Sequence, residues 1–357
     1  MAASSIPTPK TLFIVGAGAS NEAKLPVGSE LKKSISKVLD IRFENGYTMN
    51  SGDDVICNAF RIAVQSSNPP SQDINPFLQA SWRIRDAMPQ AISIDNFIDA
   101  HSNDKRIELC GKLAIVRTIL EAESKSSLFV DQSRGDNKLK FGQLENTWFS
   151  SFWQLLFENC KPSDLEQRLS SVALIIFNYD RCIEHYLYHA LQNYYSMSAS
   201  DVAQLLKHLE IYHPYGTVGS LPWLNSKNVI GYGATPHPKQ LLELASQIKT
   251  FTEGTDELSS EVNSIRSNMK MSHRLVFLGF AFHKLNMELL LPALASADLP
   301  TGQRIFATAY GISTSDIESI SAELVAKGAL SAGNIRIRND LTCSQLFREY
   351  WRSMSFV

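Results

Sequence analysis

Three apolar runs that lie far apart in the sequence constrain the fold most strongly. Thr11–Val15 stops at a glycine, Val172–Phe177 stops at Asn178, and Arg274–Leu278 stops at Gly279. Short, nearly continuous apolar runs are typical of strands that are buried on both faces of a parallel sheet. Residues with helical spacing separate these runs, and strands that alternate with helices predict an α/β fold built on a doubly wound parallel sheet.

The expected domain organisation is a nucleotide-binding α/β domain interrupted by a helical block. At 357 residues the chain exceeds the usual size of a single core, so an insertion or a second domain is expected. Helical spacing dominates residues 51–170, and strand patterns are nearly absent there. We therefore expect the first part of the α/β domain in residues 1–50, a helical insertion in 51–170, the remainder of the domain in 171–335, and a C-terminal strand and helix in 336–357.

Composition excludes several classes of function. The 34 Lys and Arg residues nearly balance the 36 Asp and Glu residues, which argues against direct nucleic-acid binding. The five cysteines are scattered without a C-x-x-C pair, so we expect neither a disulfide framework nor a metal site. No apolar run is long enough to span a membrane, and residues 1–10 lack the apolar core of a signal peptide. We expect a cytoplasmic protein.

The first apolar run leads into a glycine-rich turn, Gly16-Ala17-Gly18-Ala19-Ser20. Glycines between a strand and a helix let the backbone approach a diphosphate, so this turn is a candidate phosphate-binding loop, although packing alone can also require a tight turn. The dinucleotide fingerprint needs a third glycine, and Asn21 occupies that position. The acidic residue that binds ribose in a dehydrogenase is also missing after a second strand. A hydride-transferring enzyme is therefore disfavoured.

Polar residues follow the next two predicted strands. Asn178 and Asp180 come after the second apolar run, and His213 ends the short strand at residues 209–212. An asparagine amide can hold a ribose hydroxyl and a water together, and a histidine can accept a proton near neutral pH. Asp180 is either a ligand contact or the N-cap of the following helix. Because the carboxyl ends of parallel strands meet in one crevice, we expect these side chains to lie close together.

Three further features are open to two interpretations each. Gly279, Phe280 and Asn286 follow the third apolar run, where they either contact an adenosine or simply form a strand-to-helix turn. His185 and His189 have the spacing of a metal-binding pair, but no third ligand is evident, so an ordinary helix face is favoured. Ser93-Ile94-Asp95 either caps a helix or lines the crevice.

These motifs, in this order, resemble those of the sirtuin superfamily, and in particular the zinc-free sirtuin-like proteins of bacterial anti-phage defence. Gly16-Ala17-Gly18-Ala19-Ser20 is similar to the family's nucleotide loop, and Phe177-Asn178-Tyr179-Asp180 is similar to its N-[IY]-D motif. His213 matches the position of the family's general base. Leu278-Gly279-Phe280 with Asn286 resembles the late glycine strand that meets the adenine ribose. The resemblance covers roughly residues 11 to 290 and implies a Rossmann-like, sirtuin-type sheet.

What the resemblance implies is an NADase that uses NAD as its substrate and needs no metal. Asn178 and His213 would be catalytic, and the glycine-rich turn, Asp180, Gly279, Phe280 and Asn286 would bind NAD. The four-cysteine zinc module of the family's deacylases is missing, which disfavours an NAD-dependent protein deacylase without excluding it. A non-catalytic module that senses NAD or ADP-ribose is a further alternative. The resemblance also implies a gated defence effector that forms a homo-oligomer and works with a ring ATPase/helicase of the HerA type.

Overall fold

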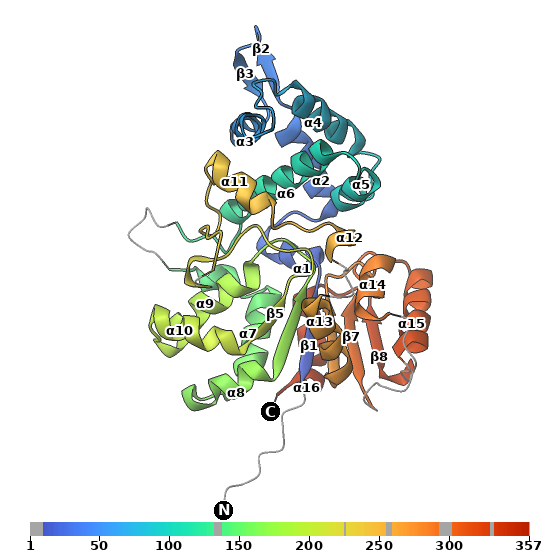
Figure 1. Ribbon diagram of the computed structural model, residues 1–357. Coiled ribbons are helices and arrows are strands. Elements are labelled where there is room, and N and C mark those ends of the chain that lie inside the picture. Colours follow the sequence, from blue (N-terminus) through green and yellow to red (C-terminus); the bar gives the residue numbers. More distant parts are fainter. Residues whose placement is uncertain are drawn as a thin grey trace, which may run out of the picture.

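A six-stranded parallel sheet forms the centre of the molecule (Figure 1). The computed structural model describes residues 10–131, 138–224, 226–254, 259–292, 302–328 and 332–356. The strands are β1 (Thr11–Val15), β4 (Val172–Ile176), β5 (Glu210–Tyr212), β6 (Arg274–Leu278), β7 (Arg304–Thr308) and β8 (Ile335–Arg338). Their order, β5-β4-β1-β6-β7-β8, is that of the dinucleotide-binding Rossmann fold, whose strand order reverses beside the first strand. The predicted doubly wound α/β fold is confirmed.

The apolar strands are buried on both faces because successive side chains alternate between two cores. Leu12 and Ile14 of β1 belong to one core, and Phe13 and Val15 belong to the other. Helices of the first layer cover the Phe13 side; they are α7 (Trp148–Phe157), α8 (Leu165–Ser170), α9 (Cys182–Tyr195), α10 (Ala199–Leu205) and α16 (Cys343–Met354). Helices of the second layer cover the Leu12 side; they are α13 (Ser260–Met271), α14 (Lys284–Leu290) and α15 (Thr314–Gly328).

A further group of helices lies beyond the carboxyl ends of the strands (Figure 1). This group, called the helical layer below, contains α2 (Gly28–Leu39), α3 (Asp54–Gln65), α4 (Asn75–Ala87), α5 (Ile94–Ala100), α6 (Lys105–Lys125) and α11 (Pro238–Ala245). A two-stranded hairpin of β2 (Arg42–Glu44) and β3 (Thr48–Ser51) projects from it. Two short helices, α1 (Ala17–Ser20) and α12 (Phe251–Gly254), lie between the sheet and the layer.

The helical layer is built from two separate parts of the chain. α11 follows β5 in sequence, yet it packs against α3 and α6. The core of the layer, including Ile56, Phe60 and Leu113, is continuous with the Leu12 side of the sheet. The layer therefore shares one core with the sheet, and it closes over the edge where the predicted site residues were expected.

The segment from Asn228 to Tyr232 has a strand-like sequence but forms no strand. Its one ladder contact is an isolated bridge between Val229 and Ser220. A buried arginine that is described below binds the main-chain carbonyls of Ile230 and Gly231, so the sheet does not supply their partners. Within the described residues, no helix is both long enough and apolar enough to cross a membrane.

The turn after β1 contacts the end of β6 through backbone alone. The amide of Gly16 donates to the Leu278 carbonyl at 2.9 Å, and the amide of Gly18 donates to the Gly279 carbonyl at 3.0 Å. A Cβ on Gly16 would lie 2.6 Å from the Gly279 oxygen. A Cβ on Gly279, whose φ is +56°, would lie 2.0 Å from the Ala19 nitrogen. Three glycines are therefore needed for this contact.

Replacing Gly279 should destabilise the protein far more than replacing a glycine in open space. Gly279→Ala combines a backbone clash, which costs about 1–3 kcal/mol, with a left-handed conformation that costs about 1–2 kcal/mol. Gly311→Ala is the matched control, because Gly311 has a φ of +79° and no atom within 4 Å of its added Cβ. Denaturant unfolding should show the larger loss for Gly279→Ala, and equal losses would contradict the described contact.

Candidate functional site

Buried polar side chains from the ends of β1 and β4 form one hydrogen-bonded chain. The Asn178 amide Nδ2 donates to Ser20 Oγ at 2.9 Å, and Ser20 Oγ donates to Asp180 Oδ2 at 2.7 Å. Ser20, Asn178 and Asp180 are each less than a tenth exposed. Asp180 also accepts the Cys182 amide at 3.2 Å, so it supports the first turn of α9 and holds Ser20 at the same time. The N-cap of α9 is Arg181 rather than Asp180, and Asp180 lines the cavity.

His213 lies directly beside Asn178 and is paired with an acid that the sequence did not single out. Its Nδ1 is 3.3 Å from the Asn178 carbonyl oxygen, and its Nε2 is 2.7 Å from Glu184 Oε1. Both neighbours are hydrogen-bond acceptors, so the doubly protonated ring satisfies both contacts. Burial lowers the pKa of His213, but the charge and hydrogen bond of Glu184 outweigh it, and the pKa is raised overall. The other carboxylate oxygen of Glu184 is buried and has no hydrogen-bond partner within the described residues.

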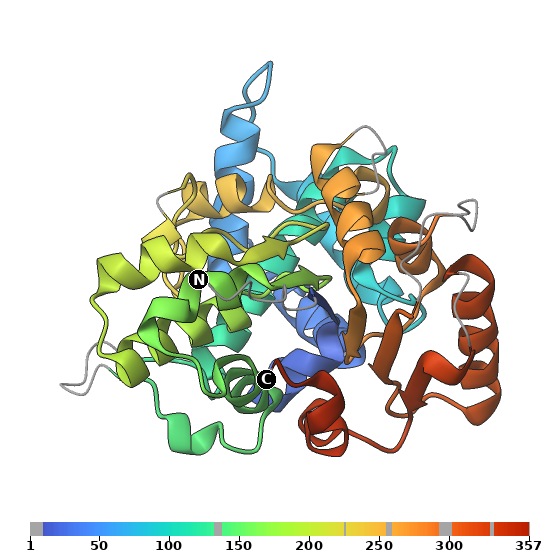
Figure 2. The same cartoon turned by 90° about the horizontal axis from the view of Figure 1, so that it is seen from below.

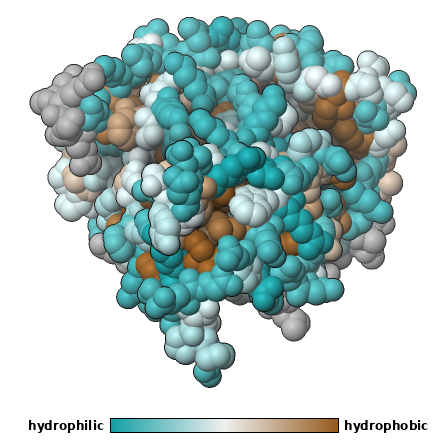
Figure 3. All heavy atoms as spheres, turned by 90° about the horizontal axis from the view of Figure 1, so that it is seen from above, coloured by the Kyte–Doolittle hydropathy of each residue, from teal (hydrophilic) through white to brown (hydrophobic). Residues whose placement is uncertain are grey.

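A cavity of about 140 Å³ lies between this polar chain and the helical layer. Its polar lining comes from the sheet side through Ser20, Asn178 and Asp180, and from the helical layer through Lys32 and Asp95. Leu25, Leu31, Ile119 and Phe177 are among its apolar lining residues. Viewed from the side of the helical layer, the surface is mostly hydrophilic, with hydrophobic groups gathered near its middle (Figure 3). The cavity is small and has polar groups on both walls.

The glycine-rich turn reaches this cavity at two points, Ala17 and Ser20. The amide of Gly18 is bound by Gly279, and the amide of Ala19 donates to the Gly16 carbonyl at 3.0 Å. Ala17 is exposed and Gly18 is half-buried, whereas Gly16 and Ala19 are buried. Gly279 therefore packs against the turn, and the close approach that it permits is that of Gly18 and Ala19.

Phe280 and Asn286 lie in an aromatic cluster beside the cavity and are not among its lining residues. Phe280 is 2% exposed, and its ring centroid is 5.1 Å from that of Phe177. The Tyr215 hydroxyl donates to Asn286 Oδ1, and the Tyr215 ring lies 5.7 Å from that of Phe177. Phe177 alone joins this cluster to the cavity. The predicted residues Phe280 and Asn286 thus adjoin the cavity only through the cluster that contains Phe177, and they do not line it.

A hydrogen bond between Tyr179 and Asp95 crosses the boundary between the sheet and the helical layer. Tyr179 follows β4, Asp95 lies in the first turn of α5, and the tyrosine hydroxyl donates to Asp95 Oδ1. Both residues line the cavity. Burial raises the pKa of Asp95, and the hydrogen bond from Tyr179 offsets part of this effect. Ser93 caps α5 through the Asn96 amide, and Ser93, Ile94 and Asp95 all line the crevice, so this segment does both.

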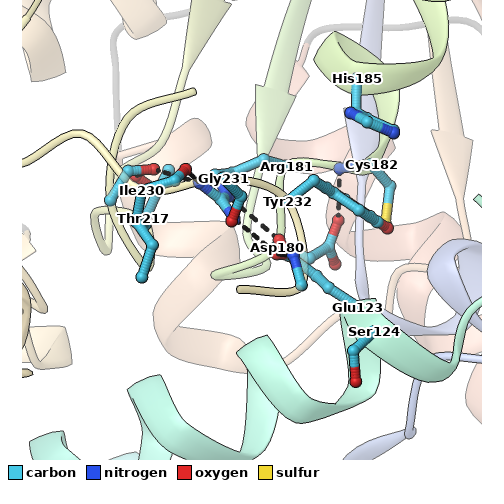
Figure 4. Close-up of polar contacts among 12 residues, drawn as sticks. Glu123, Ser124, Asp180, Arg181, Cys182, His185, Thr217, Ile230, Gly231 and Tyr232 are labelled. Atoms are coloured by element: carbon cyan, nitrogen blue, oxygen red, sulfur yellow. Dashed lines mark hydrogen bonds and ion pairs between the residues drawn. The ribbon is translucent and has the colours of Figure 1, made fainter. Parts of the chain in front are cut away.

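A buried ion pair that the sequence analysis missed fixes the loop beyond β5 (Figure 4). Arg181 and Glu123 of α6 are 2% and 0% exposed, and Arg181 Nε lies 3.0 Å from Glu123 Oε1. The same guanidinium donates to the carbonyls of Gly219, Ile230 and Gly231 at 2.8–3.3 Å. Glu123 also accepts the Gly233 amide at 2.9 Å. A basic residue at a helix N-terminus opposes the helix dipole, and this was the available signal that Arg181 needs a specific partner.

His185 and His189 lie on one face of α9 among aromatic rings. The His185 ring stacks on Tyr232 with centroids 4.0 Å apart, and its Nε2 is 3.0 Å from the Leu128 carbonyl oxygen. Burial and the neighbouring His189 hold the pKa of His185 well below its usual range. In the part of the chain that the structure describes, no group of three or more His, Cys, Asp or Glu residues is arranged to hold a metal ion.

Comparison with known proteins adds no family to this description. The chain matches no protein-family model, and a search of curated proteins finds no significant match. Functional inference therefore rests on the residues and on their geometry.

The titration of His213 provides a direct test of its pairing with Glu184. In Glu184→Gln, burial, the Asn178 carbonyl and the charge of Asp180 remain, but the larger contribution of Glu184 is lost, so the pKa of His213 should fall below its wild-type value. Because the folded-state pKa is raised, the pair stabilises the wild type fully below about pH 6.5, and this stabilisation is lost as the pH rises through the folded-state pKa. The free energy of unfolding of Glu184→Gln should lack that pH dependence.

NMR of the imidazole ring and denaturant unfolding across pH measure these two effects. Glu288→Gln, a change on the exposed side of α14, is the control and should leave His213 unaffected. An unchanged His213 pKa in Glu184→Gln would show that the carboxylate does not control this ring.

Proposed function

We propose that this protein hydrolyses NAD⁺ at its nicotinamide–ribose bond and releases nicotinamide and ADP-ribose. The observation that carries the proposal is the hydrogen-bonded chain of Asn178, Ser20 and Asp180 on the wall of a cavity at the carboxyl ends of β1 and β4, next to the strand-order reversal between β1 and β6. Ligands of open α/β sheets bind outside the carboxyl ends of the strands at such a reversal point. The sequence resemblance to sirtuin-like NADases falls on the same residues.

The polar chain supports a role for Asn178 in orienting a sugar. Ser20 accepts from Asn178 and donates to Asp180, so the Asn178 side chain has a fixed orientation on the cavity wall. A fixed carboxamide can bind a ribose hydroxyl and a water molecule together. In the proposed reaction the C1′–N bond breaks, its electron pair leaves with nicotinamide, and the water oxygen bonds to C1′. Nicotinamide departs as a neutral molecule and needs no acid to protonate it.

The proton released from this water, or from a ribose hydroxyl, would go to His213. The ring accepts a proton only in its neutral form, and Glu184 raises the pKa at which that form appears. Nδ1 faces the Asn178 carbonyl, so the imidazole must turn away from this oxygen before it acts as a base. Neither His213 nor Glu184 lines the cavity, so the site must also open here before the buried Glu184 Oε2, which has no partner among the described residues, could accept a hydrogen bond from the arriving hydroxyl or water. Glu184 is thus a positioning residue for His213.

Binding a whole dinucleotide requires the site to open. Pockets for ligands of moderate size usually measure about 300–1,000 Å³, whereas this cavity measures about 140 Å³. The helical layer forms its opposite wall, and the Tyr179–Asp95 hydrogen bond joins the two walls. We expect movement of the helical layer relative to the strand ends to admit NAD.

The second candidate is a module that binds NAD or ADP-ribose without turnover. The observation that favours it is the state of His213, since both ring nitrogens face acceptors and neither is available to take a proton in this conformation. This candidate predicts binding of NAD by the purified chain with no release of nicotinamide. An NAD-dependent deacylase would release nicotinamide only when an acylated peptide is present.

The full chain is incubated with NAD, with and without an acetylated peptide, and the products are measured by chromatography. We expect nicotinamide and ADP-ribose in both incubations. Asn178→Ala and His213→Ala should each lower the rate by about 10²–10⁴-fold, the usual effect of losing a positioned acid–base group. Asn103→Ala and His208→Ala are the matched controls, because both residues are exposed and lie outside the site. Unchanged turnover in both site variants would refute the proposed roles. Binding without turnover would favour the second candidate.

An ungated NADase would exhaust the NAD of its own cell, so we further propose that assembly controls the activity. The expected partners are further copies of this chain and a ring ATPase/helicase of the HerA type, in a cytoplasmic anti-phage role. Mass measurement of the purified chain, alone and with a co-encoded ATPase, should show an oligomer or a mixed complex. A monomer under both conditions would contradict this form of control.

A further inference from the structure

A second cavity lies near the amino ends of β7 and β8, at the opposite end of the strands from the candidate NAD site. It measures about 250 Å³ and is lined by Arg304, Phe306, Gly333, Asn334, Arg336, Tyr350 and Ser353. Figure 2, viewed from below, shows the region where α16 lies beside these two strands. The cavity shares no lining residue with the candidate NAD site.

The register of the two strands aims both arginines at this cavity. Phe306 of β7 is paired with Arg336 of β8, and side chains alternate along each strand, so residues 304, 306 and 336 share one face. α16 packs on that face. The Arg304 guanidinium carbon lies 5.2 Å from the centroid of the buried Phe306 ring, which forms an apolar floor. The cavity is thus built from the sheet and is not a chance gap between loops.

The wall opposite the sheet comes from α16, which departs from helical geometry at Tyr350 (φ −111°, ψ 21°). The Tyr350 ring lies 5.1 Å from that of Phe306, at an angle of 47°. Ser353 accepts from Arg304 at 3.4 Å. The rings of Tyr350 and Phe306 therefore line the same small cavity as the guanidinium groups of Arg304 and Arg336.

The positive charge of the cavity is not neutralised by the described residues. Arg336 donates to the carbonyls of Gly333 and Ile335 at 2.7 and 2.9 Å. Within the described residues, no carboxylate lies within 4 Å of Arg304 or Arg336. By contrast, Arg338, two residues further along β8, pairs with Asp340 at 2.8 Å and with Glu349 at 3.4 Å. Two of these three arginines thus keep an uncompensated charge.

A third arginine adds to the local field. Arg274 of β6 is paired in register with Arg304 and is buried, and it donates to the Ser355 carbonyl at 2.8 Å. Burial and the nearby charge of Arg304 lower the pKa of Arg274 to about 10. Like charges on directly paired positions of a sheet are destabilising, and a bound anion would offset this repulsion.

We propose that this cavity binds a phosphate ester of mononucleotide size, with the phosphate between Arg304 and Arg336 and a flat ring against Tyr350. The planar guanidinium fork matches the oxygens of a phosphate in a bidentate arrangement. A ring placed on the aromatic wall would gain stacking contacts. The volume of about 250 Å³ is close to the lower end of the range for ligands of moderate size, about 300–1,000 Å³, which favours a mononucleotide over a longer chain. The site is separate from the proposed NAD hydrolysis and does not depend on it.

Calorimetric titration of the full chain with AMP, inorganic phosphate and adenosine tests this site. AMP should bind more tightly than inorganic phosphate, and adenosine, which lacks the phosphate, should not bind. Arg304→Gln and Arg336→Gln should each weaken AMP binding about tenfold or more, since each removes charge-assisted hydrogen bonds. Arg352→Gln, an exposed change on α16 outside the cavity, is the control of equal charge and should leave binding unchanged.

The two sites are distinguished by the double variant Arg304→Gln/Arg336→Gln. This variant leaves Ser20 and Asn178 intact, so AMP bound at the carboxyl ends of the strands would retain its affinity. Retained affinity in the double variant, or no AMP binding by the wild type up to millimolar concentration, would overturn the proposal. Circular dichroism of each variant establishes that it is folded, and both arginines are exposed, so their replacement should leave the core unchanged.

Discussion

The backbone contact between the β1 turn and the end of β6 is the constraint on which the site depends. Gly16 and Gly18 donate to the carbonyls of Leu278 and Gly279 across a gap too narrow for any side chain. This contact fixes the short helix α1, and Ser20 at its end is thereby held opposite Asp180 at 2.7 Å. Asn178 binds Ser20 in turn, so the polar wall of the cavity is positioned by the packing of glycines.

The sequence predicted the sheet well because its central strands are unambiguous. Val172–Ile176 and Arg274–Leu278 are buried on both faces; the latter ends at the residue that the pattern indicated, and the former ends one residue before the expected Phe177. Asn178 and His213 were expected to meet because parallel strands end at one edge, and the structure places the His213 ring 3.3 Å from the Asn178 carbonyl oxygen. The strand-like segment at 228–232 forms no strand, because Ile230 and Tyr232 pack into the two cores while Arg181 binds the carbonyls of Ile230 and Gly231.

The remaining site residues could not be predicted from the sequence, because their roles depend on contacts between helices that are distant in the chain. Glu184 lies in α9 with no local feature that marks it, and only the fold brings it within 2.7 Å of His213. Gly279 was expected either to contact an adenosine or to form a strand-to-helix turn, and in the structure it packs against Gly18 and Ala19 of the chain itself. Glu123 belongs to a helix that is buried along most of its length. Its partner, Arg181, can therefore be identified only once the fold is known.

The buried pair of Arg181 and Glu123 has a mechanical consequence for the helical layer. Arg181 directly follows Asp180, and Glu123 is close to the end of α6, so the pair anchors that end of the helix to the strand tips. Removing one partner of a buried ion pair typically costs about 3–5 kcal/mol, whereas a single hydrogen bond such as Tyr179–Asp95 typically contributes about 0.5–1.5 kcal/mol. The helical layer is therefore held more firmly to the strand ends at Glu123 than at Asp95.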